Sequence, residues 1–263
     1  MKKILLGAAV AMLGIAPALA ADMAPRYTKA PAPMMESVYN WTGFYIGGNV
    51  GYGWSDSRVD AYTLNAGTVL VLPPPFVNQR TDGFTAGGQV GYNWQSGMWV
   101  FGLEADAAWR DGKNSTVFAF ANGLDFTTFT TKENYLATFR PRVGIAANNW
   151  LFYVTGGAAV QGREHSFFEN RPTVAGANRL ITSDDTRWGW TVGAGVEAGF
   201  GNWSVGLEYL YADFGRNTTL TAPAQVLGGI PFGTSTVTFH DSAEQLARVK
   251  VNYRFGGPVV ARY

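Results

Sequence analysis

Apolar and small-or-polar residues alternate along most of the chain, in segments of about ten to thirteen residues that begin near Asn40. Between Phe84 and Trp94, for example, every second residue is apolar or small, and the residues between them are Thr, Gly, Gln or Asn. An alternation of period two predicts a β-strand with one apolar face and one polar face. The pattern occurs eight times, so eight strands are expected.

Short and long connections alternate between these predicted strands. The short ones, at 95–97, 148–149 and 201–202, consist of Gly, Asn, Ser and Gln, which favour tight turns. The four long ones cover about 55–80, 110–133, 164–186 and 212–243, each longer than is usual in a compact domain. Three short turns on one side and four long loops on the other predict an antiparallel up-and-down barrel of eight strands.

The outward face of this barrel is almost without charge, and the charged residues share the other face with glycine. A soluble sandwich or lipocalin-like barrel would instead turn its charged face to water. In a bilayer a sheet must close on itself, and a tilted strand needs about 9–11 residues to cross it. Aromatic residues near the ends of the apolar faces predict two girdles at the headgroup level. The predicted girdle residues are Trp54, Trp94, Trp99, Trp109, Tyr135, Trp150, Trp188, Phe200, Trp203 and Tyr211.

Acidic and basic residues balance on the inward face. Eight strands enclose a space just wide enough for side chains, and charges in it are costly unless they are paired. We therefore expect an ion-pair network that plugs the lumen, with a narrow selective conduit as the alternative. The predicted network comprises Glu104, Asp106, Arg140, Arg142, Glu197, Glu208, Glu244, Arg248, Lys250 and Arg254.

The start of the chain has the features of a secretory signal. Lys2 and Lys3 precede an apolar stretch that is too short to span a bilayer, and Ala18-Leu19-Ala20 follows it. Cleavage is expected after residue 20, with an N-terminal anchor helix as the alternative. The predicted parts of the chain are a signal peptide at 1–20, a Pro- and Ala-rich periplasmic lead-in at 21–38, the barrel at 39–255 and a tail at 256–263.

The overall composition limits the classes of partner that are expected. Only 15% of the 263 residues are charged, against roughly 25% in soluble proteins. The formal net charge of +1 gives no reason to expect nucleic acid as a partner, and the absence of cysteine rules out disulfides and thiolate chemistry. The expected partners are outer-membrane lipid and the assembly machinery of the outer membrane.

No arrangement of residues in the sequence indicates catalysis or a cofactor. The two histidines, His165 and His240, fall in predicted long loops, where solvated rim positions are expected. Neighbouring residues of a strand face opposite sides, so Glu164, His165 and Ser166 cannot form a triad among themselves. We therefore expect no catalytic, cofactor-binding or metal-binding residues.

Three apolar stretches in the predicted loops, at 69–77, 117–120 and 226–232, are unusual for exposed segments. Exposed apolar clusters often mark interaction sites, so they could bind a host or cell-surface ligand. Equally, these stretches could extend the hairpins above the membrane and pack against each other.

The opening segment, Tyr39-Asn40-Trp41-Thr42-Gly43-Phe44-Tyr45-Ile46-Gly47-Gly48-Asn49, resembles that of the small outer-membrane immunogenic, opacity-type proteins of alphaproteobacteria. The last predicted strand, at 248–255, is similar to theirs. The resemblance implies an OmpA-like eight-stranded barrel of the bacterial outer membrane that acts as a surface antigen, sometimes described as a porin, without catalytic residues. Such barrels often end at a terminal Phe, whereas here a tail follows Phe255.

Overall fold

The computed structural model describes residues 39–65, 68–71, 77–119, 124, 126–170, 178–215, 217–222, 225–227, 230–232 and 234–256. The predicted signal peptide and lead-in, and most of the predicted tail, lie outside these residues. The strands are β1 (Gly43–Asn65), β2 (Thr68–Val71), β3 (Val77–Ser96), β4 (Trp99–Ala119), β5 (Phe126–Ala147), β6 (Trp150–Asn170), β7 (Arg179–Phe200), β8 (Trp203–Asp213), β9 (Asn217–Ala222), β10 (Gln225–Leu227), β11 (Ile230–Phe232) and β12 (Thr234–Arg254).

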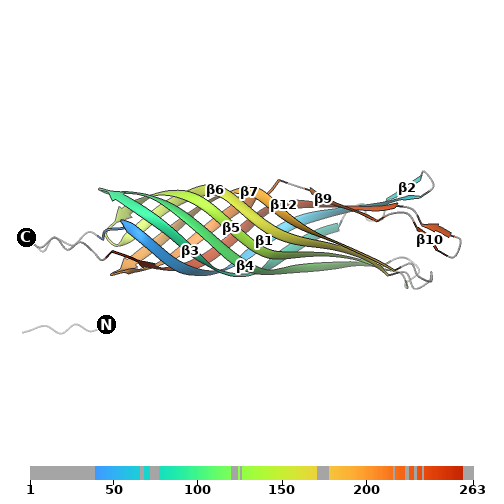
Figure 1. Ribbon diagram of the computed structural model, residues 1–263, viewed down its shortest axis with the longest axis horizontal. Coiled ribbons are helices and arrows are strands. Elements are labelled where there is room, and N and C mark those ends of the chain that lie inside the picture. The colour runs from blue at the N-terminus through green and yellow to red at the C-terminus, as the bar shows by residue number, and fades with distance from the viewer. Residues whose placement is uncertain are drawn as a thin grey trace, which may run out of the picture. The chain divides into compact units, whose positions relative to one another are not determined.

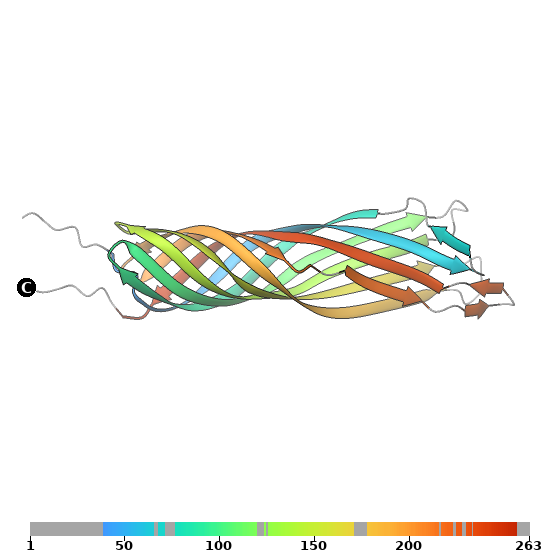
Figure 2. The same cartoon turned by 90° about the horizontal axis from the view of Figure 1, so that it is seen from above.

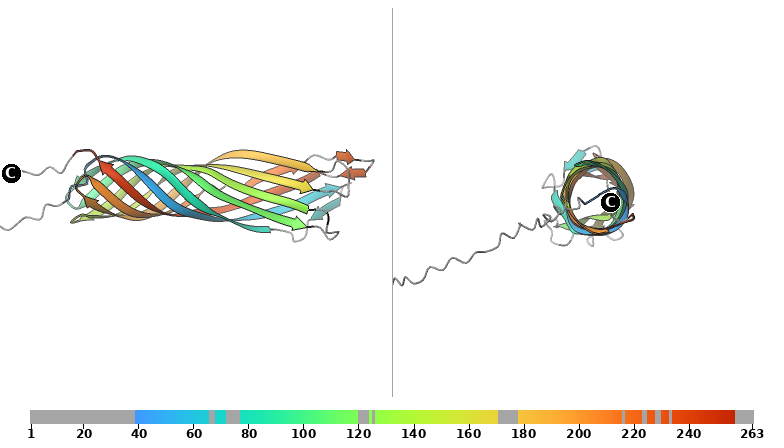
Figure 3. Two further views of the ribbon diagram at one scale, coloured as in Figure 1. Left: turned by 90° about the horizontal axis from the view of Figure 1, so that it is seen from below. Right: turned by 90° about the vertical axis from the view of Figure 1, so that its left-hand side faces the viewer.

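Eight long strands close into an antiparallel barrel. Neighbours pair in the order β1-β3-β4-β5-β6-β7-β8-β12, and β12 returns to β1 from Tyr45–Arg254 to Leu64–Thr234. The ring is visible along the barrel axis in the right panel of Figure 3. This closure confirms the predicted fold class. No helix in the described part of the chain is long and apolar enough to cross a membrane.

Three two-residue turns join the strands at one end of the barrel. They lie between β3 and β4, β5 and β6, and β7 and β8, and their first residues are Gly97, Asn148 and Gly201. All three have a φ between 53° and 60°, which Gly and Asn adopt at low cost. The predicted turns at 148–149 and 201–202 are confirmed, whereas the first turn, predicted at 95–97, is Gly97-Met98 because β3 includes Gln95 and Ser96.

The strands continue far beyond the membrane. Apart from β8, which β9 follows after a short break, the long strands have 20–23 residues, about twice the number needed to cross a bilayer. Much of each predicted long loop is therefore strand, as Figures 1 and 2 show. We call the part between the short turns and the Trp109–Tyr135 pair the membrane half, and the strands beyond it the extracellular half.

Two β-bulges change which residues face inward. On β5 both Asn134 and Tyr135 are exposed, so the buried positions are even-numbered below the bulge and odd-numbered above it. On β12 the pairing with β1 shifts between Ser55 and Ser57, and the buried positions change from even to odd numbers in the same way. An added residue that redirects side chains is the usual effect of a bulge.

The extracellular half consists of two facing sheets. Among the described residues, the β3–β4 ladder ends at Thr85–Arg110, the β7–β8 ladder ends at Trp190–Asp213, and no ladder joins β9 to β7. One sheet contains β9, β12, β1, β2 and the end of β3, and the other contains β4 to β7. We call the two lines between them seams. Side chains bridge the seams: Asn114 Nδ2 donates to the carbonyl of Arg80 at 2.6 Å, and Arg187 contacts Thr218.

Pro141 interrupts one ladder inside the membrane half. The pairing of β5 with β6 passes from Phe139–Ala158 directly to Arg142–Thr155, because Pro141 has no N–H to donate. The hydroxyl of Thr155 donates to the carbonyl of Pro141 at 2.9 Å, which satisfies one backbone acceptor at the interruption. The strand therefore continues across the bilayer.

Candidate functional site

The lumen of the membrane half contains a compact ion-pair network. Arg140 is fully buried and lies 2.7 Å from Glu104, 2.9 Å from Asp106 and 3.3 Å from Glu208. Lys250 Nζ reaches Glu104 at 2.6 Å and Glu208 at 3.3 Å. Glu104 and Glu208 thus each meet both cations, which offsets the desolvation of buried charge.

The remaining members extend this network around the barrel wall. Arg248 bridges Asp106 at 2.9 Å and Glu208 at 2.6 Å, and Arg142 lies 2.8 Å from Glu197. Two tyrosines complete the shell, since Tyr45 donates to Glu104 and Tyr153 to Glu208. Four acids and four bases are together, so this network, which we call the lower network, carries no net charge. Its charged members are Glu104, Asp106, Arg140, Arg142, Glu197, Glu208, Arg248 and Lys250.

Two predicted members lie elsewhere. Glu244 is fully buried but belongs to a second cluster above, where it pairs with Arg110. Arg254 lies at the short-turn mouth, with its guanidinium 4.6 Å from the ring centre of Tyr39 and its Nη2 3.4 Å from the carbonyl of Gly201. Burial raises the pKa of Tyr39, which precedes β1, and the positive charge of Arg254 opposes that shift.

The second cluster, the upper network, contains residues that the sequence analysis assigned to loops. Glu133 lies 2.8 Å from both Arg110 and Arg163 and 3.2 Å from the hydroxyl of Ser55, and Gln161 donates to Glu244. For Arg110 and Glu133, which lie in the predicted loop at 110–133, the alternation that continues through 110–118 and 127–133 is the signal that could have found them.

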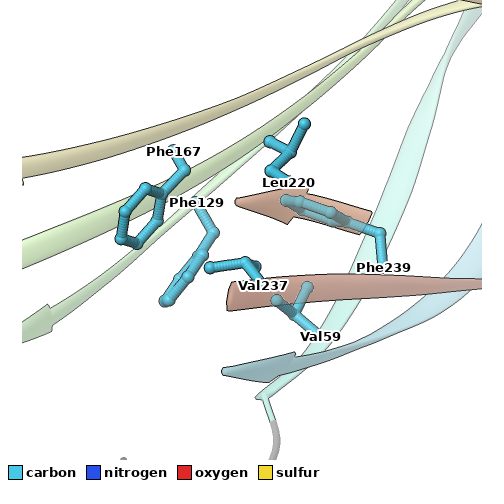
Figure 4. Close-up of a cluster of buried hydrophobic side chains, with 6 residues drawn as sticks. All are labelled: Val59, Phe129, Phe167, Leu220, Val237 and Phe239. Atoms are coloured by element: carbon cyan, nitrogen blue, oxygen red, sulfur yellow. The ribbon is translucent and has the colours of Figure 1, made fainter. Parts of the chain in front are cut away.

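Three apolar layers separate and cover the two networks. The base, next to the short turns, contains Trp41, Val100, Leu151 and Tyr153. The belt, between the networks, contains Leu136, Ala159, Leu210, Ala212, Phe214 and Leu246. The cap, in the extracellular half, contains Val59, Phe129, Phe167, Leu220, Val237 and Phe239, with Phe118 and Ile181 packed against it. Figure 4 shows the six buried cap side chains pointing toward one another from strands of both sheets.

The histidines occupy different environments. His165 was predicted to be a solvated loop or rim residue, and this is wrong, because it is fully buried in the lumen. Its ring lies 4.5 Å from that of Phe239, and its Nδ1 lies 3.2 Å from the hydroxyl of Thr131. The continuation of β6 into the extracellular half turns this side chain inward. His240 is partly exposed and lies 3.0 Å from Asp60.

The residues beside His165 do not share its side of the sheet. Glu164 lies on the outer face, where it pairs with Lys132 at 3.2 Å. The described residues contain no group of three or more His, Asp or Glu that could hold a metal ion.

All ten predicted girdle residues point outward, in two bands. Trp94, Trp99, Trp150, Phe200 and Trp203 lie next to the short turns, and Trp54, Trp109, Tyr135, Trp188 and Tyr211 lie where the extracellular half begins. On β4, Trp99 and Trp109 are ten residues apart. A rise of about 3.3 Å per residue and a tilt of about 40° separate them by roughly 25 Å along the barrel axis, the height of the apolar band of such barrels.

Comparison with known proteins agrees with this architecture. The outer membrane protein beta-barrel domain matches residues 6–255. The chain is 32% identical to the 31 kDa outer-membrane immunogenic protein of Brucella melitensis over 97% of this chain and all of that protein. It is also 32% identical to the 22 kDa outer membrane protein of Rhizobium leguminosarum bv. viciae, over 66% of this chain and 65% of that protein.

Among solved structures, the outer membrane protein OprG of Pseudomonas aeruginosa is similar at 13% identity and a TM-score of 0.38, over 82% of this chain and 98% of that one. The match to the domain covers nearly the whole chain, and the relatives are outer-membrane proteins. The chain belongs to the family of outer-membrane β-barrel proteins and resides in the bacterial outer membrane.

Proposed function

We propose that this barrel is a sealed, non-catalytic surface protein, which strengthens the outer membrane and presents its extracellular half to other molecules. The observation that carries the proposal is the filled lumen. Base, lower network, belt, upper network and cap follow one another along the barrel, and their side chains are almost all buried. A path for ions would have to cross three layers of apolar side chains, where desolvation of an ion is costly.

The relatives support the surface role. Those of Brucella are named outer-membrane immunogenic proteins, and the names state no reaction. On this proposal the extracellular half is the part that antibodies or a host ligand would meet. The division of the chain into a signal at 1–20, a lead-in at 21–38, a barrel at 39–255 and a tail at 256–263 is part of the same proposal.

Single-channel recording in a planar bilayer tests the sealed lumen. The protein should give no discrete conductance steps under conditions in which a larger porin, added as a positive control, conducts. Reproducible small steps that change when Arg140 and Arg142 are replaced by Gln would instead make the protein a narrow pore. Arg58→Gln is the matched control, because Arg58 lies on the outer face of the extracellular half.

A further inference from the structure

A groove crosses the outer face of the membrane half. Ala247 on β12 lies opposite Tyr52 on β1 and opposite Tyr209 on β8, so a small side chain stands between two large ones. In the same row, Ala194 lies beyond Tyr209 and Phe84 beyond Tyr52. The space between them has a volume of about 870 Å³.

The lining of the groove is apolar. Besides the residues of this row, Val50, Val196, Leu207 and Val249 contribute side chains. Glu208 and Arg248 contribute only their strand backbone, since both side chains are buried in the lumen, where they pair at 2.6 Å. A ligand in this groove would therefore meet hydrocarbon and no charge.

Polar contacts hold the two tyrosine walls upright. Tyr52 donates to Asp82 and packs edge-on against Phe84, with ring centres 5.3 Å apart. Tyr209 donates to Gln245 at 2.8 Å. Asp82 and Gln245 both lie on the extracellular side of the row, so the hydroxyl ends of the walls mark the level of the outer headgroups. The groove is thus preformed and extends from that level into the hydrocarbon.

We propose that this groove binds one acyl chain of a lipid in the outer leaflet. The groove is continuous with the face of the barrel that contacts the bilayer, so the molecules that reach it are the lipids of that bilayer. Lipid tails are as apolar as the groove, so the hydrophobic effect does not drive binding, and selectivity comes from close packing against rigid walls. Two other grooves on the outer face of the membrane half have volumes of about 540 and 370 Å³, so this groove offers a chain more room than either.

Native mass spectrometry of the protein, extracted from outer membranes in mild detergent and supplemented with lipid A, the acylated part of outer-leaflet lipopolysaccharide, tests the proposal. The wild type should retain one lipid. Ala247→Trp fills the groove, and because it removes on the order of ten carbon–carbon packing contacts, the lipid-bound fraction should fall about tenfold. Ala158→Trp is the control, since Ala158 is an exposed alanine on the lipid-facing side of β6, outside the groove.

Ala194→Phe fills the same groove from its other side and should reproduce the loss. Each variant is first checked for folding by its heat-dependent shift on a gel. If Ala247→Trp and Ala194→Phe retain lipid, or if Ala158→Trp loses it equally, the lipid is unspecific annular lipid and the proposal fails. A dimer that disappears in Ala247→Trp would assign the groove to a second copy of the chain and would also overturn it.

Discussion

On β5 the two halves of the barrel differ in the character of their outer faces. In the membrane half, Arg140 faces the lumen and Phe139 faces outward. In the extracellular half, Phe129 faces the lumen, and its neighbours Thr128 and Thr130 lie on the outer face. The outer face of the strand is therefore apolar where lipid surrounds it and polar where water does. Its lumen face stays largely polar, since Thr127, Thr131 and Glu133 are buried beside Phe129.

The backbone differs between the halves as well. Throughout the membrane half the ladders form a continuous ring, apart from the interruption at Pro141, where Thr155 supplies a hydrogen bond. In the extracellular half the ring opens along two seams. Water can satisfy unpaired backbone groups and hydrocarbon cannot, so complete closure is required only within the bilayer. The surrounding solvent, more than the strand itself, determines both the pattern of side chains and the pairing.

Removal of a central cation of the lower network should cause the largest loss in the free energy of unfolding. Removal of an exposed cation of the extracellular half should cause almost none. Arg140→Ala leaves Glu104, Asp106 and Glu208 with fewer partners, and breaking a buried ion pair typically costs about 3–5 kcal/mol. The free energy of unfolding in urea, measured in lipid vesicles, should fall by that amount. Arg80→Ala, at an exposed cation of the extracellular half, should change it by about 0.5 kcal/mol or less.

If Arg140→Ala lowers the free energy of unfolding by less than about 1 kcal/mol, the proposed contrast between the two halves is wrong. Such a small loss would mean that water enters the lower network and solvates the carboxylates. Arg140→Lys keeps the charge but cannot reach three carboxylates, so it should fall between the alanine variant and the wild type.

A matched pair of valines tests the outer faces. Val154 on β6 and Val117 on β4 both point outward, with 56% and 61% of their surface exposed, but only Val154 lies between the girdles. Val154→Lys should destabilise the protein by about 2–4 kcal/mol, the cost of a lysine facing the middle of the bilayer. Val117→Lys should have almost no effect, because water solvates the new charge.

Equal effects in urea unfolding for the two lysine variants would show that the boundary between the halves is misplaced. If Val117→Lys is the costlier of the two, lipid or a partner covers the outer face of the extracellular half. The change in unfolding free energy for Val154→Lys therefore reports on the bilayer, and the change for Val117→Lys reports on what surrounds the extracellular half.

The membrane half could be predicted from the sequence because its alternation is of large apolar residues against glycine and charge. Trp99 to Trp109 and Val249 to Phe255 show which side meets lipid without knowledge of the partner strands. Which inward charges pair could not be predicted in full. Glu244 and Arg254 share the inward face with the lower network but lie too far along β12, above and below it.

The strands of the extracellular half could not be predicted from the sequence, for a different reason. On β12, for example, Thr236-Val237-Thr238-Phe239 has the same period but places the apolar residues inside, and its threonines occur in loops as well as in strands. The bulges on β5 and β12 then change the inward positions from even to odd numbers, so the two halves of each strand cannot be read as one pattern. A bulge depends on the partner strand, and one strand's sequence does not show it.

The smallest expected effect concerns an ion pair on the outer face of the extracellular half. Lys132 and Glu164 lie 3.2 Å apart but remain partly exposed, so they resemble the lower network in geometry and differ from it in solvation. Lys132→Ala should cost about 0–1 kcal/mol, and the coupling between the two residues in a double-mutant cycle with Glu164→Ala should be of the same size and fall with added salt. A coupling above about 2 kcal/mol that resists salt would mean that something covers this pair, and that the extracellular half does not meet water there as the membrane half meets lipid.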